Sequence, residues 1–170
     1  MRVLPLLIAS LWFTPAAFTQ LTPDALRVGQ GWLRQDCAVG DQGQVIVLFN
    51  RSKADFEQFF LDALKSGPPA DLLAQVDSAS ARLFDLRQEA LRSGKTLGLS
   101  PANLQYVRQT TKDQYVASER ARFVNHYNSQ AVSGLAIVAG AQGKAALRAL
   151  AADPRSPLRE IARESLARLP

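Results

Sequence analysis

The last third of the chain uses one residue pattern twice, and this repeat constrains the fold more than any other feature of the sequence. Two segments place two small residues and then two large apolar residues at the same internal steps, 31 positions apart, as from Ala131 to Ala162. The matched positions are Ala131, Gly134, Leu135 and Val138 in the first copy, and Ala162, Ser165, Leu166 and Leu169 in the second. Small residues let neighbouring helices approach closely, and large ones fill the groove between them. One helix pair per about 30 residues predicts an α-solenoid.

The turn of this repeat lies between the two copies, in the stretch ALRALAADPRSPLREIARESLARL. Asp153 and Pro154 are predicted to end one helix, and Ser156 and Pro157 to begin the next. This order of helix, Asp-Pro turn, Arg and Ala-rich helix resembles the HEAT repeat, in particular the short HEAT-like form found in phycobilin lyases. The resemblance implies that Asp153 and Arg159 support the turn and the contacts between repeats.

The resemblance covers residues 129–170, about one and a half repeats, and residues 22–128 depart from it. About three stacked units are needed for stability, so the longer N-terminal helices must supply the missing packing surface. We expect them to be divergent repeats, with a cap as the alternative. The predicted fold is therefore all-α, a HEAT-like solenoid with longer divergent N-terminal helices.

Local signals predict six or seven helices. Helix starts are expected at Thr22-Pro23, at Ser100-Pro101 and at Thr111, where Gln114 completes a capping box. A helix is predicted over 54–66, and a break near Asn128-Ser129 is an open alternative. The apolar run QVIVLF, residues 44–49, has no second strand candidate to pair with, so a buried helix is expected there.

A long helix is predicted over 71–93. Its apolar residues advance by steps of four and three, which predicts a continuous stripe facing the core. The stripe consists of Leu72, Val76, Ala79, Leu83, Leu86 and Ala90.

The first twenty residues, MRVLPLLIASLWFTPAAFTQ, have the composition of an export signal. A positive residue precedes an apolar stretch too short for a comfortable membrane span, and small residues follow. Residues 1–20 are therefore predicted to be a signal peptide, with an uncleaved membrane anchor as the alternative, and residues 21–170 a single all-helical domain. The expected location is periplasmic or extracellular.

The net charge indicates which kinds of partner to expect, and the cysteine count limits which disulfides can form. The net charge of +5 is mild and suits an acidic protein or an anionic envelope component as the partner. Nucleic-acid binding is not expected, unless residues 1–20 are not a signal peptide. The single cysteine, Cys37, excludes an internal disulfide. It is expected to be a small apolar core residue, with an intermolecular disulfide as the alternative.

Catalytic patterns are weak throughout. His126 is the only histidine, which excludes a two-histidine metal site, and we expect no metal and no cofactor. The stretch GAQGKAAL fails the phosphate-loop pattern in glycine spacing and lacks the Ser or Thr that would hold magnesium. Two carboxylate pairs one helical turn apart, Asp85 with Glu89 and Glu160 with Glu164, are interleaved with arginines and are typical of solvated helix faces.

Two features remain as binding candidates. Four basic residues near the C-terminus form either an ordinary soluble surface or a patch for an acidic partner. They are Arg148, Arg155, Arg159 and Arg163. Trp32, among glycines, is either a core anchor or a ligand-stacking residue.

The expected function is that of an exported, non-catalytic adaptor or scaffold that presents a helical-repeat surface to a protein or anionic envelope partner. The alternative is an enzyme, glycosylase-like or lyase-like, since HEAT-like folds also carry catalysis. A deep cleft that gathers Trp32, His126 and carboxylates would favour the enzyme, whereas a shallow groove would favour the scaffold.

Overall fold

The protein is all-helical, as predicted. The structure is a computed structural model that describes residues 21–35, 41–94, 98 and 100–169, so the predicted leader and Cys37 lie outside it. Within the described residues the chain forms eight α-helices and no strand. They are α1 (Pro23–Arg34), α2 (Gln42–Arg51), α3 (Lys53–Ser66), α4 (Ala70–Arg92), α5 (Pro101–Gln109), α6 (Lys112–Val138), α7 (Ala141–Ala152) and α8 (Arg159–Ala167).

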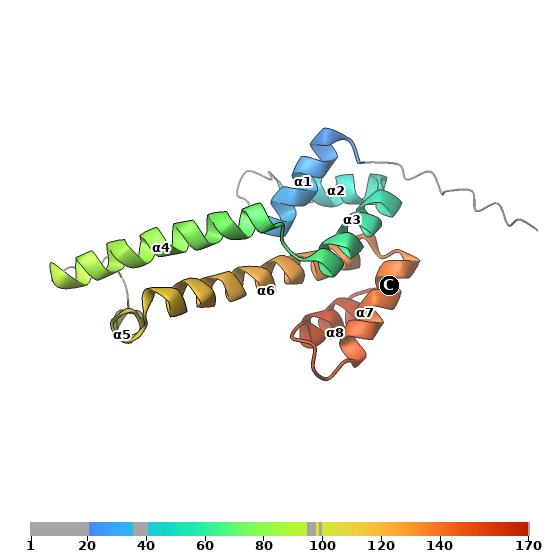
Figure 1. The fold of residues 1–170 in the computed structure, drawn as a ribbon. Coiled ribbons are helices and arrows are strands. Elements are labelled where there is room, and N and C mark those ends of the chain that lie inside the picture. Colours follow the sequence, from blue (N-terminus) through green and yellow to red (C-terminus); the bar gives the residue numbers. More distant parts are fainter. Residues whose placement is uncertain (1–20, 36–40, 95–97, 99, 170) are drawn as a thin grey trace, which may run out of the picture.

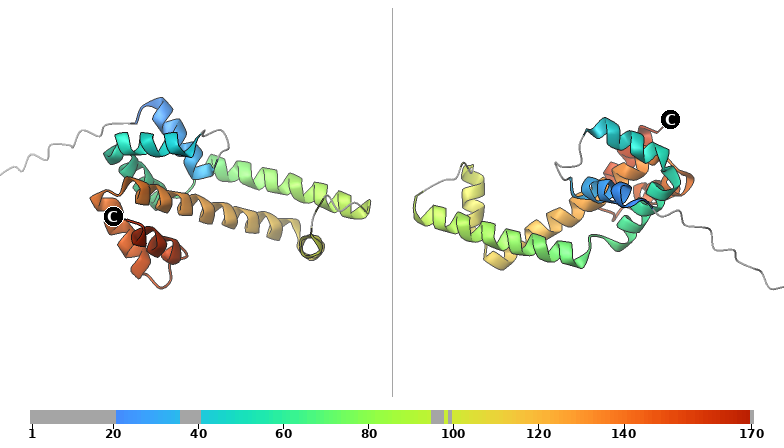
Figure 2. Two further views of the ribbon diagram at one scale, coloured as in Figure 1. Left: turned by 180° about the vertical axis from the view of Figure 1, so that it is seen from behind. Right: turned by 90° about the horizontal axis from the view of Figure 1, so that it is seen from above.

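Helix α6 is the axis of the molecule. It has 27 residues and therefore spans about 40 Å. Its first half lies beside α4, and the two form an arm that is closed at its far end by α5 (Figure 1). Its second half lies between α1–α3 on one side and α7 and α8 on the other, which together form a body (Figures 1 and 2).

The suggested break near Asn128-Ser129 does not occur, because α6 continues through both residues. Ser129 Oγ donates to the carbonyl of Asn125, and Ser133 Oγ donates to the carbonyl of Ser129. Each hydroxyl is thus satisfied one turn earlier in the same helix, so it does not compete with the helical hydrogen bonds.

Most predicted helix starts are confirmed. Thr22 and Ser100 accept hydrogen bonds from backbone amides of the first turns of α1 and α5, and Thr111 forms the capping box with Gln114. The start at Ser156-Pro157 was predicted too early. Those two residues and Leu158 form a turn in which Ser156 Oγ accepts from the Leu158 amide, and α8 begins afterwards.

The body has a core rich in phenylalanine. Phe49 of α2 lies with its ring centroid 4.4 Å from that of Phe56 and 5.2 Å from that of Phe60, both on α3. All three side chains are fully buried. The run 44–49 is helical as predicted, but only one face of it is buried, since Ile46 and Val47 are 40% and 50% exposed.

Both copies of the C-terminal pattern are packed. Ala131 on α6 and Ala162 on α8 are fully buried, and the two helices are in contact. Leu166 and Leu169 are half-buried against the same core, and the other matched residues are buried. Close packing of the helices that carry the two copies of the pattern requires this burial. The solenoid arrangement itself remains a prediction.

The predicted inward stripe of α4 is wrong over its middle, from Ala79 to Leu86, whereas Ala90 at its end is buried as predicted. Leu83 and Leu86 are 39% and 63% exposed, and Phe84 is buried instead. Phe84 packs against Tyr115 of α6, with ring centroids 5.4 Å apart, and Val107 of α5 completes this second cluster. Away from the body α4 packs on one side only, and burying an aromatic pair there removes more apolar area from water than burying the leucines.

Candidate binding pocket

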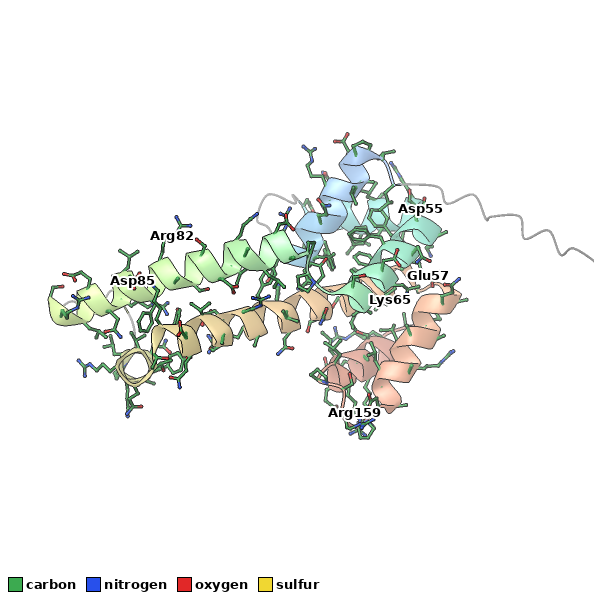
Figure 3. All side chains as sticks on the ribbon, viewed as in Figure 1. Asp55, Glu57, Lys65, Arg82, Asp85 and Arg159 are labelled. Carbon is green, nitrogen blue, oxygen red and sulfur yellow. The ribbon has the colours of Figure 1, made fainter. Side chains whose placement is uncertain are left out.

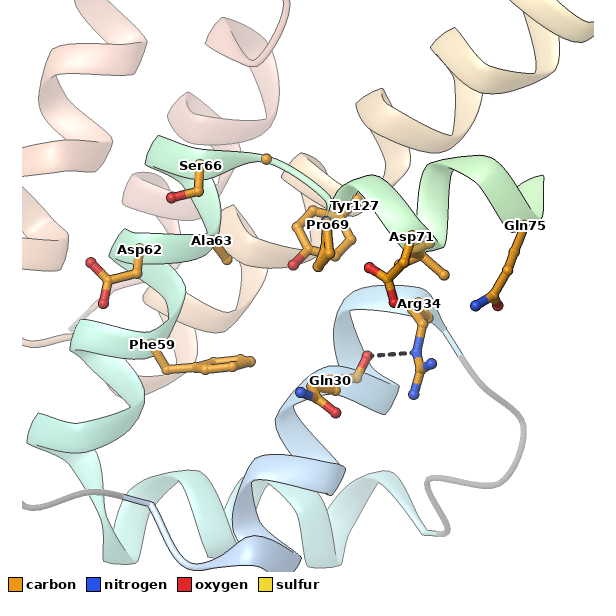
Figure 4. Close-up of a pocket in the computed structure, with 12 residues that line it drawn as sticks. Gln30, Arg34, Phe59, Asp62, Ala63, Ser66, Pro69, Asp71, Gln75 and Tyr127 are labelled. Carbon is orange, nitrogen blue, oxygen red and sulfur yellow. Dashed lines mark hydrogen bonds between the residues drawn. The ribbon is translucent and has the colours of Figure 1, made fainter. Parts of the chain in front are cut away.

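A pocket of about 370 Å³ lies where α1, α3, α4 and α6 meet (Figure 4). Each of these helices contributes at least one residue to its wall. The lining residues are Gln30, Arg34, Phe59, Asp62, Ala63, Ser66, Gly67, Pro69, Asp71, Leu72, Gln75 and Tyr127. The volume falls within the range of roughly 300–1,000 Å³ that is usual for ligand sites.

The turn between α3 and α4 forms one wall of this pocket. Gly67 ends α3 with a φ of 68°, a left-handed backbone conformation that favours glycine. Pro69 then precedes the first residue of α4. The short turn sends α4 away from α3, and the end of α1 lies across the angle between them (Figure 4).

The pocket has an apolar floor and a polar rim. Ala63 and Tyr127 on the floor are buried, and Phe59 and Leu72 beside them are half-buried. The rim residues are exposed and carry charges of both signs as well as amides. They are Gln30, Arg34, Asp62, Asp71 and Gln75.

Hydrogen bonds hold two of the rim side chains. Arg34 Nε donates to the carbonyl oxygen of Gln30 at 3.3 Å, and Gln58 Nε2 donates to the Asp62 carboxylate at 2.9 Å. On the floor, burial raises the pKa of the Tyr127 phenol, and the nearby Arg34 charge offsets part of this rise. Tyr127 is therefore neutral at physiological pH, and its hydroxyl can donate or accept a hydrogen bond.

Neither Trp32 nor His126 lines the pocket. The Trp32 ring meets Phe49 edge-on with centroids 5.4 Å apart, and its Nε1 donates to the carbonyl of Gln130 at 2.9 Å, so it anchors α1 to α2 and α6. His126 is half-buried on α6, and its Nε2 has no hydrogen-bond partner among the described residues. This pocket is therefore not the cleft, expected for an enzyme, in which Trp32, His126 and carboxylates would lie together.

The four predicted arginines lie on α7, α8 and the turn between them. Arg148 is exposed on α7, and Arg155 in the turn has a 94% exposed side chain 4.0 Å from Asp153. Asp153 Oδ1 also accepts from the Arg155 amide, which closes this turn locally. The other two arginines lie one helical turn apart.

Arg159 and Arg163 are the other two predicted arginines, and both lie on α8. Arg159, at the start of the helix (Figure 3), is half-buried and its Nε has no hydrogen-bond partner among the described residues. Arg163 pairs with Glu160 at 3.2 Å. The structure thus brings Arg155, Arg159 and Arg163 to one turn and the helix that follows it.

The carboxylate pairs are engaged in exposed ion pairs. Asp85 lies 2.6 Å from Lys112, and Glu89 lies 3.3 Å from Arg92. Glu164 lies 3.7 Å from Arg168. Pairs of this kind contribute little to stability and are typical of solvated faces.

The stretch GAQGKAAL contains the start of α7, and a carboxylate already occupies that helix end. The Gly143 amide donates to Glu57 Oε1 of α3. The same carboxylate lies against Gly140, where a Cβ atom would be only 2.2 Å from it. Glu57 therefore takes the place that an anion would need at this helix N-terminus.

No local sequence pattern marks any of the pocket residues as a site. The Gly67-Pro68-Pro69 turn signal lies beside the pocket, but it gives no information about what packs across it. Gln30 and Arg34 reach the pocket because α1 packs on α6 and, at Gly29, against Phe59 of α3, contacts between segments that are distant in the chain. Local patterns do not specify such contacts.

No cluster of three or more His, Cys, Asp or Glu side chains arranged to hold a metal ion is found in the part of the chain that the structure describes. None of the helices formed by these residues combines the length and the hydropathy that crossing a membrane requires. Comparison of the chain with known protein families, curated proteins and solved structures gave no match.

Proposed function

We propose that the protein is a non-catalytic binding protein, an adaptor that holds a segment of a protein partner in the pocket between α1, α3 and α4. The observation that carries this proposal is the lining of the pocket, where buried or half-buried apolar side chains lie beneath an exposed rim of mixed charge. An exported location, which the leader predicts, is part of the same proposal.

This lining suits a peptide segment. An apolar side chain of the partner would rest on Phe59 and Leu72, which together supply an aromatic and an aliphatic surface. Gln30 and Gln75 offer both donors and acceptors, as the backbone amides on either side of that side chain require. Arg34 with Asp62 and Asp71 would select the charges that flank the anchor.

An enzyme on the same fold is the competing proposal. Its support is that the pocket contains two carboxylates, Asp62 and Asp71, and paired acids can hydrolyse glycosides. Both side chains are exposed, whereas a catalytic acid usually lies in a cleft that excludes water. The adaptor proposal explains the exposed rim without further assumptions.

Crosslinking from the pocket rim tests the adaptor proposal. A photo-reactive residue in place of Gln75 should form a discrete adduct with a protein of the exported fraction, whereas the same residue in place of the exposed Gln142 of α7 should not. Leu72→Arg, which fills the floor, should abolish the adduct, and Leu26→Arg on the open face of α1 should leave it intact. An adduct that survives Leu72→Arg, or equal adducts from both positions, would overturn the proposal.

The arginines near the α7–α8 turn offer an alternative contact with an acidic partner. Charge reversal of Arg155 and Arg159 together would abolish capture of such a partner, and capture would weaken steeply with added salt because exposed charges are screened. Capture that depends on Arg155 and Arg159 but not on Leu72 would replace the pocket proposal with this one.

A further inference from the structure

Helix α4 carries a coiled-coil pattern on a face that the fold leaves open. The predicted stripe from Leu72 to Ala90 advances by alternating steps of four and three, which is the a and d spacing of a heptad. In the arm, a different face of α4 packs against α5 and α6, with Ser80 and Phe84 buried. The middle of the stripe, Ala79 to Leu86, therefore has no partner helix among the described residues.

Two opposite charges lie on the same flank of this stripe. Arg82 precedes Leu83 and points away from α6 (Figure 3), and Glu89 follows Leu86 at the next equivalent heptad position. Among the described residues Glu89 pairs only with Arg92, through an i,i+3 contact of 3.3 Å in which the side chains are 68% and 72% exposed. An exposed pair of this kind is weak and exchanges readily for another.

The opposite flank is already occupied. Arg87 turns toward the arm's own cluster, where its guanidinium donates to the Tyr115 hydroxyl and lies 5.5 Å from the centre of the Tyr115 ring. Only the flank that carries Arg82 and Glu89 is thus available to a helix laid along the stripe.

We propose that two copies of this chain associate through the stripe, with their α4 helices antiparallel about a two-fold axis beside the midpoint between Leu83 and Leu86. This axis sets Leu83 of each copy against the partner's Leu86. On the open flank it brings Arg82 of each copy toward the partner's Glu89. Each contact forms twice, because a two-fold interface uses the same patch on both copies.

Charge order favours a second copy in this orientation. Arg82 and Glu89 lie at opposite ends of the Leu83–Leu86 pair. When a second copy lies antiparallel, the basic end of each patch meets the acidic end of the other, so the patch is complementary to itself. A parallel pairing would set the Arg82 flank of one copy against the Arg87 flank of the other, since g and e positions meet in parallel coiled coils. The arm's own cluster already occupies the Arg87 flank, which disfavours the parallel dimer and leaves the antiparallel one.

The dimer is expected to be weak. Its seam is limited to about two leucine layers, because Ala90 at the distal end of the stripe is already buried within its own chain. Association should therefore depend on protein concentration within an ordinary experimental range.

Sedimentation of the full chain over about a hundredfold range of concentration tests this proposal. The natural sequence should shift from monomer to dimer with rising concentration. The double variant Leu83→Glu/Leu86→Glu should weaken dimerisation by about tenfold or more, because each substitution places a carboxylate in the seam. Leu26→Glu, at a leucine of α1 that is 38% exposed, should leave dimerisation unchanged.

Charge exchange gives a second readout at exposed positions that do not contribute to the core. Arg82→Glu and Glu89→Arg should each weaken the dimer, because each sets like charges together, and the double variant Arg82→Glu/Glu89→Arg should restore it. Circular dichroism should show the same helix content in all variants. A chain that stays monomeric at every concentration, a dimer that persists in Leu83→Glu/Leu86→Glu, or a double charge variant weaker than both single variants would overturn the proposal.

Discussion

At the scale of the residue, Gly134 of α6 and Phe60 of α3 pack in close contact. A Cβ atom on Gly134 of α6 would lie 2.5–2.6 Å from three ring atoms of Phe60 on α3, which is far inside normal contact. Phe60 is fully buried among other aromatic rings, so its ring has no free space to move into. The absence of a side chain at position 134 thus sets how closely α3 approaches α6.

Gly134→Ala should therefore destabilise the protein. Alanine is ordinarily the better helix former by roughly 1 kcal/mol, but overpacking a core costs about 1–3 kcal/mol, and the second effect should win here. Urea unfolding should show a lower free energy of unfolding for this variant. If Gly134→Ala proved more stable than the natural sequence, the close approach of α3 to α6 would be wrong.

A compensating change provides the control. Phe60→Leu removes part of the ring that the new methyl group would meet. Gly134→Ala should consequently cost less in the Phe60→Leu background than in the natural one, since substitutions in direct contact are not additive. Equal costs in both backgrounds would show that the methyl group clashes elsewhere.

At the scale of the element, α7 depends on a residue from another helix for its N-terminal cap. Gly140, its own N-cap residue, supplies no side chain, and Glu57 of α3 accepts from the Gly143 amide instead. A helix end needs such acceptors for its unpaired amides, and a carboxylate also interacts favourably with the positive end of the helix dipole. The cap therefore also ties α7 to the body.

Glu57→Ala should lower the free energy of unfolding by about 1–2 kcal/mol, because it removes a cap and leaves a part-buried amide without its acceptor. Glu57→Gln keeps an acceptor oxygen and should cost less. Chemical denaturation of both variants checks the order. Glu164→Ala, which removes an exposed ion pair on α8, is the matched control and should stay within about 0.5 kcal/mol of the natural protein. Equal losses for Glu57→Ala and Glu164→Ala would rule out the cap.

At the scale of the whole molecule, the buried apolar residues that the structure describes form two separate clusters joined by α6. The body cluster contains fifteen buried residues, whereas the arm cluster contains Phe84, Val107 and Tyr115. Local stability follows the amount of buried apolar contact, so the arm should open more easily than the body. The arm is also the part that carries the proposed dimer seam, while the pocket is lined by the start of α4 and by residues of the body.

Hydrogen exchange should resolve these two regions. In the Leu83→Glu/Leu86→Glu variant, where association does not contribute, amides of α5 and the second half of α4 should exchange faster than those of α3 and the second half of α6. Tyr115→Ala should speed exchange in the arm and leave the body amides nearly unchanged. Exchange at one uniform rate in both regions would mean that the molecule opens as a single unit.

Local sequence signals predict the helices and most of their ends. Thr22, Ser100 and Thr111 act through hydrogen bonds within three residues, so their effect is visible without knowing the rest of the fold. Helical structure over 44–49 followed from the lack of a strand partner. Ala131 and Ala162 were also recognisable as contact positions, because a repeated pattern of small and large residues reports on packing.

Only the tertiary structure decided which faces those helices bury and what they build together. Leu83 and Leu86 have the spacing of a core stripe, yet Phe84 is buried because Tyr115 and Val107 lie across from it. The pocket and the Glu57 cap likewise join residues that are distant in the chain. Periodicity identifies an apolar face, but the free energy of burying it depends on the side chains opposite, which a single helix does not specify.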